Sequence, residues 1–159
     1  MSTTTTTLKP RMDHPVMVVP EAMAALQAFG AAIAECGLPH RTVELVNFRA
    51  SQINGCAVCL EGGARDARKH GETDDRLLVL SGWREAPFFT DAERAALALT
   101  EAVTRLADRA EPVPDDVWAE AAAHYEERAL AGLVLQIANI NIWNRLNVTT
   151  RQLAGTYTW

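Results

Sequence analysis

The sequence lacks several features that would place it in a membrane or on nucleic acid. No apolar run approaches the roughly 18–20 residues needed to cross a bilayer. The opening residues 1–9 form a threonine tract rather than a charged stretch followed by an apolar one, so they do not resemble a secretory signal. Lys and Arg number 15 against 20 Asp and Glu, a net charge of −5, and form no basic patch suited to phosphates. We therefore expect a cytoplasmic protein without a membrane or nucleic-acid partner, with residues 1–12 as a disordered leader.

The sequence also lacks segments in which apolar and polar residues alternate, as they do in half-buried strands. Alanine is abundant instead, and apolar residues recur at helical spacing. A chain of 159 residues with 48% hydrophobic residues can bury one core. We predict a single all-α domain over residues 13–159, built from about seven helices. The expected helices cover 20–35, 42–53, 56–70, 74–82, 90–106, 114–125 and 128–146, with a last turn or two after Thr149.

Cysteine is scarce, with three in the chain, yet two of them form a Cys-x-x-Cys pair at Cys56 and Cys59. The pair falls at the expected start of a helix, where unpaired amides and the helix dipole stabilise a thiolate over a thiol. A spacing of three residues also lets the two sulfurs close into a disulfide across one helical turn. This pattern favours redox chemistry in a reducing compartment. Cys36 lies at an apolar helix end and is predicted to be a small core residue.

Half of a zinc site is the main alternative for the cysteine pair. Such a site needs two further ligands, usually a second Cys-x-x-Cys or a histidine pair at short spacing. His40, His70 and His124 are scattered along the sequence, so we expect no bound metal. The pair alone leaves redox and zinc-binding roles open.

The residues around the pair resemble a known family. The segment 44–59, ELVNFRASQINGCAVC, closely resembles the central motif of the alkylhydroperoxidase AhpD-like proteins, within the carboxymuconolactone decarboxylase-like superfamily. That motif is a glutamate, eleven residues, Cys-x-x-Cys, three residues and a histidine; Glu44, Cys56 and Cys59 match it in type and spacing. Further matches lie at 66–68, 71–73, 83–84, 87–89, 93–97 and 143–145. The resemblance covers almost everything after the threonine tract.

The resemblance implies an all-α AhpD-like bundle that assembles as a homo-oligomer, often a trimer or hexamer. It also implies antioxidant reduction of hydroperoxides by a peroxidase that needs no metal, flavin or haem. By the family pattern, Cys59 attacks the peroxide, Cys56 resolves the product, and Glu44 acts with the histidine to deprotonate Cys59. The implied reductant is a dithiol such as dihydrolipoamide, or a thioredoxin-like protein. A lactone decarboxylase-like or purely structural role is disfavoured, because such relatives do not need both cysteines.

One position departs from the family motif. Gly63 stands where the histidine is expected, four residues after Cys59. If the two helices fold back on each other, Glu44 lies about 15 Å from the turn, opposite residues 63–66 and too far to reach Cys59. Water could fill the space at Gly63, or His70 could reach back along its helix. Alternatively, the protein is a thiol–disulfide oxidoreductase with little peroxidase turnover.

A last expectation concerns assembly. Apolar residues of the expected helix 42–53 lie on more than one side, with Leu45 and Phe48 outside the main stripe. We interpret this broad apolar face as a surface buried against a partner chain.

Overall fold

The computed structural model describes residues 7–157, which form helices and loops and contain no strand. The all-α prediction is therefore confirmed, and all the expected helices are present. One short helix, α1, was not predicted. The helices are α1 Pro15–Val18, α2 Pro20–Ala34, α3 His40–Asn54, α4 Ala57–Lys69, α5 Asp74–Val79, α6 Asp91–Thr104, α7 Asp115–His124 and α8 Glu127–Thr150, with 3₁₀ turns η1 Leu80–Gly82 and η2 Leu106–Asp108. Among the residues described, no helix combines the length and apolar character that a membrane span requires.

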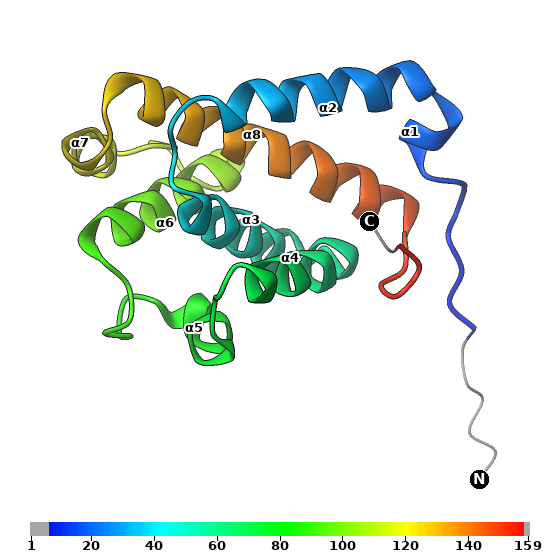
Figure 1. Ribbon diagram of the computed structural model, residues 1–159, viewed down its shortest axis with the longest axis horizontal. Coiled ribbons are helices and arrows are strands. Elements are labelled where there is room, and N and C mark those ends of the chain that lie inside the picture. The colour runs from blue at the N-terminus through cyan, green and yellow to red at the C-terminus, as the bar shows by residue number, and fades with distance from the viewer. Residues whose placement is uncertain (1–6, 158–159) are drawn as a thin grey trace, which may run out of the picture.

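The helices are arranged around α3 and α8 (Figure 1). Helix α2 lies along one side of α8, while α3 lies on its other side and contacts α4 and α6 as well. The broad apolar face of α3 is thus buried within its own chain, because Leu45, Val46 and Ala50 are all inaccessible there. The expectation of a partner chain on this face was wrong: several helices of the same chain cover it.

Two apolar clusters make up the core. The first joins α3, α6, α7 and α8, and the second lies under α5 and η1, on the other side of α6. The buried members of the first cluster are Val46, Ala96, Leu99, Ala121, Tyr125, Leu130, Leu133 and Ile137. Those of the second are Leu45, Leu80, Trp83, Ala86, Phe89 and Leu97. Adjacent residues of α3, Leu45 and Val46, enter different clusters, which explains why its apolar residues do not form one stripe.

A buried ion pair fastens α3 to α6. The Glu101 carboxylate, 4% exposed, accepts hydrogen bonds from Arg49 Nε at 2.8 Å, Trp83 Nε1 at 3.0 Å and Arg84 Nη1 at 2.8 Å. Burial raises the pKa of Glu101, but the hydrogen bonds from Arg84, Trp83 and Arg49 outweigh it, and the pKa lies below its ordinary value. Glu101 is therefore held as an anion in the interior.

Two helix ends show how neighbouring residues begin or end a helix by capping its free amides and carbonyls. Thr90 begins α6 with a capping box, since its hydroxyl accepts from the Glu93 amide and the Glu93 carboxylate accepts from the Thr90 amide. Helix α8 does not stop at residue 146 and restart, as predicted, but continues to Thr150. It ends where Arg151 adopts a left-handed conformation, φ 55°, and its amide donates back to the last turn.

The predicted disordered leader over 1–12 falls partly on residues 1–6, which lie outside the described residues. Over residues 7–12 the chain forms neither helix nor strand, but it contacts the end of α8. The Arg11 amide donates to the Thr150 carbonyl at 2.9 Å, and the Arg11 guanidinium donates to the Thr149 carbonyl at 2.7 Å. The Gln152 side chain donates to the Met12 carbonyl at 3.0 Å. The two ends of the described chain are therefore joined.

Candidate functional site

The cysteine pair lies at the turn between α3 and α4. Gly55, with φ 67°, ends α3 in the left-handed region that favours glycine, and it turns the chain towards Cys56. Cys56 is the N-cap of α4, where its sulfur accepts a hydrogen bond from the Cys59 amide at 3.3 Å. The two cysteines form a disulfide. The sequence prediction of a cysteine pair at a helix start, close enough to bond, is confirmed.

Amide side chains hold this turn against α8. Asn54 donates to both Asn141 Oδ1 and Asn144 Oδ1 at 2.9 Å. Asn144 in turn donates to Ser51 Oγ at 3.0 Å and is fully buried. Buried amides of this kind are costly unless they are paired, so these contacts fix the position of the turn relative to α8. The cysteines consequently sit on a rigid support.

The two sulfurs border different hollows in the surface. Cys56 is 1% exposed and borders a hollow of about 460 Å³, formed by residues from both ends of the chain. Cys59 is half-buried and borders a second hollow of about 400 Å³. The walls of the second hollow are Met23, Gln27, Asn47, Val58, Gly62, Gly63, Asp66, Ile140, Trp143 and Asn147. A small molecule entering this second hollow reaches Cys59 through a mostly apolar opening.

Asn147 of α8 lines both hollows and contacts Cys59. Its Nδ2 donates to Cys59 Sγ at 3.4 Å and to the Trp143 carbonyl at 3.0 Å. An amide donor stabilises a thiolate more than a thiol, because the bond to the charged acceptor is stronger. Asn147 was not predicted from the sequence, since a buried asparagine in a long helix carries no local signal of a contact 88 residues away.

His14 lies behind Asn147. Its Nδ1 accepts a hydrogen bond from the Val16 amide at 3.3 Å, so the neutral ring carries its proton on Nε2. That Nε2 and Asn147 Oδ1 are both buried and have no partner within hydrogen-bonding distance. Burial lowers the pKa of His14, and its polar contact with Asn147 partly opposes this effect. Burial therefore favours the neutral form of His14 near Asn147, the residue whose Nδ2 contacts Cys59.

Replacing Asn147 by leucine should slow the reaction of reduced Cys59 with iodoacetamide at pH 7 by about tenfold. The physical reason is the loss of one hydrogen bond to a charged sulfur, for which about 1.5–3 kcal/mol is typical. The measurement is made in a Cys36→Ser, Cys56→Ser background, so that only Cys59 is alkylated.

Asn139→Leu is the matched control for this prediction. Asn139 lies on the same helix, is 8% exposed and contacts neither cysteine. An equal slowing in both variants would mean that Asn147 acts only through packing.

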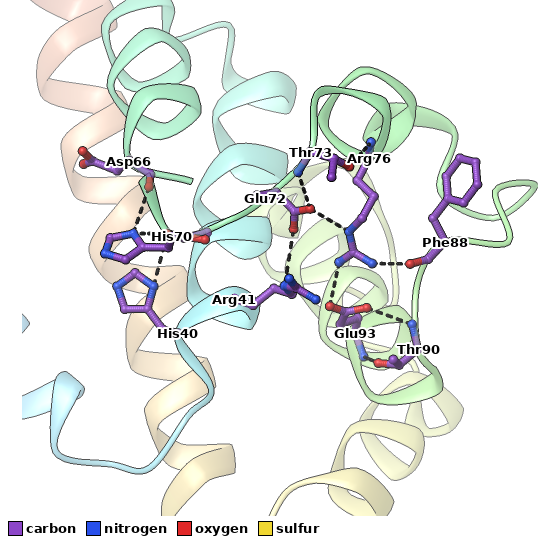
Figure 2. Close-up of polar contacts among 11 residues, drawn as sticks. His40, Arg41, Asp66, His70, Glu72, Thr73, Arg76, Phe88, Thr90 and Glu93 are labelled. Atoms are coloured by element: carbon purple, nitrogen blue, oxygen red, sulfur yellow. Dashed lines mark hydrogen bonds and ion pairs between the residues drawn. The ribbon is translucent and has the colours of Figure 1, made fainter. Parts of the chain in front are cut away.

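Glu44, the third predicted site residue, contacts neither cysteine. Its Oε1 lies 2.8 Å from His70 Nδ1 and 3.2 Å from His40 Nδ1 (Figure 2 shows the two rings side by side). The same His70 Nδ1 lies 2.8 Å from the Asp66 carbonyl, so the Glu44 carboxylate lies close to residue 66, within the stretch 63–66 expected opposite it. Whether Glu44 takes part in catalysis stays a prediction.

Position 63, where the family motif has a histidine, has room for a side chain. Gly63 lines the hollow beside Cys59, and a Cβ added there would lie 3.5 Å from Phe48 Cδ2, an ordinary contact. His70 does not fill this space, since its Nδ1 contacts Glu44 and lies 2.8 Å from the Asp66 carbonyl, to which it can donate. The prediction that position 63 lies near Cys59 is thus confirmed, and His70 does not take the place of the imidazole.

Two of the three histidines that are scattered in the sequence, His40 and His70, are close in space, whereas His124 lies apart on α7. His40 begins α3 and His70 follows the end of α4, and their ring centroids lie 4.2 Å apart. The spacing of thirty residues in the sequence misled the prediction. Because α3 and α4 form a hairpin, the residue that follows α4 lies next to the residue that begins α3.

Comparison with known proteins places these features in a family. The model of the carboxymuconolactone decarboxylase family matches residues 20–102, which include Glu44 and both cysteines. The uncharacterized protein YdfG of Bacillus subtilis is 37% identical over 139 residues, covering 87% of this chain and 93% of its own length. These matches include the segment that carries the cysteine pair.

Solved structures share the fold. A protein of unknown function from Agrobacterium tumefaciens, for which an AhpD antioxidant role has been suggested, superposes with a TM-score of 0.86 at 34% identity, covering 94% of this chain and all of that one. The debrominase Bmp8 has a TM-score of 0.74 at 19% identity, covering 89% of this chain and 75% of its own. The family model, the similarity to YdfG and the shared helical fold together show that the chain is an AhpD-like member of the carboxymuconolactone decarboxylase family.

Proposed function

We propose that this protein is a thiol-dependent hydroperoxide reductase in which Cys59 attacks the peroxide and Cys56 resolves the product. The observation that carries the proposal is the position of Cys59. Its sulfur borders an open hollow, accepts a hydrogen bond from Asn147 and is within bonding distance of Cys56. Cys56 is buried beneath a different opening, which suits a resolving thiol better than an attacking one.

The proposed cycle has three steps. The Cys59 thiolate attacks the O–O bond, taking one oxygen as a sulfenic acid, while the other oxygen leaves as an alkoxide and takes up a proton to become the alcohol. The Cys56 thiol then attacks the Cys59 sulfur, which forms the disulfide and releases water. An external dithiol reduces this disulfide by exchange and is itself oxidised to a disulfide. Oxygen, electrons and protons balance over the cycle without a metal or an organic cofactor.

Peroxide consumption by the reduced wild-type protein tests the proposal. With cumene hydroperoxide and dihydrolipoamide we expect catalytic turnover, together with a Cys56–Cys59 disulfide detected by mass spectrometry after peroxide treatment alone. A protein that forms no disulfide with peroxide, and consumes none beyond the uncatalysed rate, would refute the proposal.

A second candidate function is thiol–disulfide exchange with little peroxidase turnover. The observation that favours it is the absence of an imidazole beside Cys59, since Gly63 supplies no side chain and Glu44 contacts His40 and His70 instead. Rapid reduction of a small disulfide substrate, with slow oxidation by peroxide, would identify this second function.

Gly63→His should raise the rate at which peroxide oxidises Cys59 by about tenfold or more at pH 7. Residues four apart on a helix are neighbours, so the new imidazole lies within reach of Cys59 and accepts its proton as a general base. Ala64→His is the control, since Ala64 is half-buried on the same helix, does not line the hollow, and lies five residues after Cys59, about 140° around the helix from it.

Stopped-flow measurement of Cys59 oxidation in the two variants gives the comparison. An equal acceleration by both substitutions would point to a general effect of charge. No acceleration by Gly63→His would show that this chain does not need the imidazole that the family pattern contains.

A further inference from the structure

Glu44 differs from the other buried glutamates in its partners. In the described residues the buried glutamates are Glu44, Glu72, Glu93 and Glu101. The last three pair with arginine: Glu72 and Glu93 share Arg76, with distances of 2.8 and 2.7 Å, and Glu101 pairs with Arg49. Figure 2 shows the Arg76 pairs beside the histidines. The partners of Glu44, which is 8% exposed, are two imidazoles and no arginine within the described part of the chain.

Two imidazoles compensate a buried carboxylate poorly. The charge of an arginine is permanent, whereas imidazole loses its charge around neutral pH. The Nδ1 atom of His70 is also shared between Glu44 and the Asp66 carbonyl. The nearby Lys69 pairs with the Asp66 carboxylate at 3.2 Å and not with Glu44. Among the residues that the structure describes, the buried Glu44 carboxyl group thus has no permanently charged partner, and a metal ion would supply one.

We propose that His40, Glu44 and His70 form a binding site for a divalent transition-metal ion of the Zn²⁺ type. One potential ligand atom from each of the three side chains lies within 4.8 Å of the other two. In a tetrahedral zinc site, ligand atoms about 2.0–2.1 Å from the ion are roughly 3.4 Å apart. The 2.8 and 3.2 Å separations from Glu44 therefore need only a small outward movement of the rings.

The exposure of the ligands suits an open site. His40 and His70 have side chains 63% and 52% exposed, so their rings can rotate and the ion can enter from solvent. Two imidazoles and one carboxylate leave at least one position for water, as in sites with three protein ligands. On binding, the Nδ1 atom of each ring presents its lone pair to the metal, and the ring proton resides on Nε2. For His70 this replaces the contact with the Asp66 carbonyl.

This site is separate from the cysteine pair. His70 follows the end of α4, eleven residues beyond Cys59 and about 16 Å along the helix direction. A metal ion there would join the start of α3 to the end of α4, at the opposite end of the hairpin from the disulfide. The proposal therefore stands whether or not the redox function does.

Calorimetric titration of Zn²⁺ into the oxidised protein tests the site. The disulfide removes Cys56 and Cys59 as competing ligands, and we expect one saturable site per chain. His40→Gln and His70→Gln should each weaken Zn²⁺ binding at least tenfold, because each removes a ligand. Both side chains are more than half exposed, so circular dichroism should show that the variants remain folded.

His124→Gln is the matched control. His124 forms an ordinary exposed pair with Glu120 at 3.1 Å, four residues away on α7, and this substitution should leave Zn²⁺ affinity unchanged. Zn²⁺ should also raise the melting temperature of the wild type more than that of His70→Gln, because a ligand that binds the folded state stabilises it. Absence of saturable binding, or equal affinity in the wild type and both histidine variants, would overturn the proposal.

Discussion

Replacing Cys59 by serine should reduce peroxide consumption at least a hundredfold. A serine hydroxyl is not ionised near neutral pH, and the nucleophile in the proposed first step is a thiolate. Cys59 is also the cysteine that borders the apolar hollow and contacts Asn147, so Cys56 is not placed to substitute for it. The assay is consumption of cumene hydroperoxide with excess dihydrolipoamide.

The Cys56→Ser variant distinguishes the attack of Cys59 on the peroxide from the later attack of Cys56 on the sulfenic acid. In this variant Cys59 should still react with one equivalent of peroxide, but its sulfenic acid should persist and be trapped by dimedone, since no neighbouring thiol displaces water. Cys36→Ser is the control, because Cys36 is a free cysteine outside the pair and its loss should leave turnover unchanged. If Cys56→Ser abolished the first reaction while Cys59→Ser retained it, the two roles would be reversed.

Replacing Glu101 by leucine should lower the free energy of unfolding by about 3–5 kcal/mol, the cost typical of removing one partner from a buried ion pair. The substitution leaves the Arg49 guanidinium, whose side chain is 10% exposed, without its carboxylate. It also removes the acceptor of the Trp83 ring N–H. Urea denaturation followed by circular dichroism measures the change.

The contribution of Glu101 also has a defined pH dependence. Because the folded state holds the pKa of Glu101 below its ordinary value, the stabilisation is complete above that ordinary value and is lost as the pH falls through the folded one. Glu120→Leu serves as the control, since Glu120 is 62% exposed and such surface pairs contribute about 1 kcal/mol or less. If both variants lost the same free energy of unfolding, the buried network around Glu101 would stabilise the fold no more than a surface pair does.

Much of the fold could be predicted because its signals are local. Gly55 and the capping box at Thr90 mark helix ends by rules that depend on a few neighbouring residues. Helix α1 escaped prediction because four residues are too few to show a period. The broad apolar face of α3 was assigned to a partner chain because a sequence pattern reports how much of a helix is buried, but not what buries it.

The site was predictable to the extent that it is local. Cys56 and Cys59 are three residues apart, so helix geometry brings them together without knowledge of the rest of the fold. Asn147 and His14 reach the site from opposite ends of the sequence, and only the packing of α8 brings them there. The meeting of His40 and Glu44 with His70 depends on how α3 and α4 pair, which their residue spacing does not reveal.

The hollow beside Cys56 is formed by the first and last parts of the described chain, residues 7–9 and 147–153, on either side of the turn at 55–57. During synthesis, both cysteines therefore emerge from the ribosome long before the segment that encloses Cys56. The hollow beside Cys56 can therefore be complete only once residue 153 has been made. The contact between the Arg11 amide and the Thr150 carbonyl then joins the first of its two walls to the last.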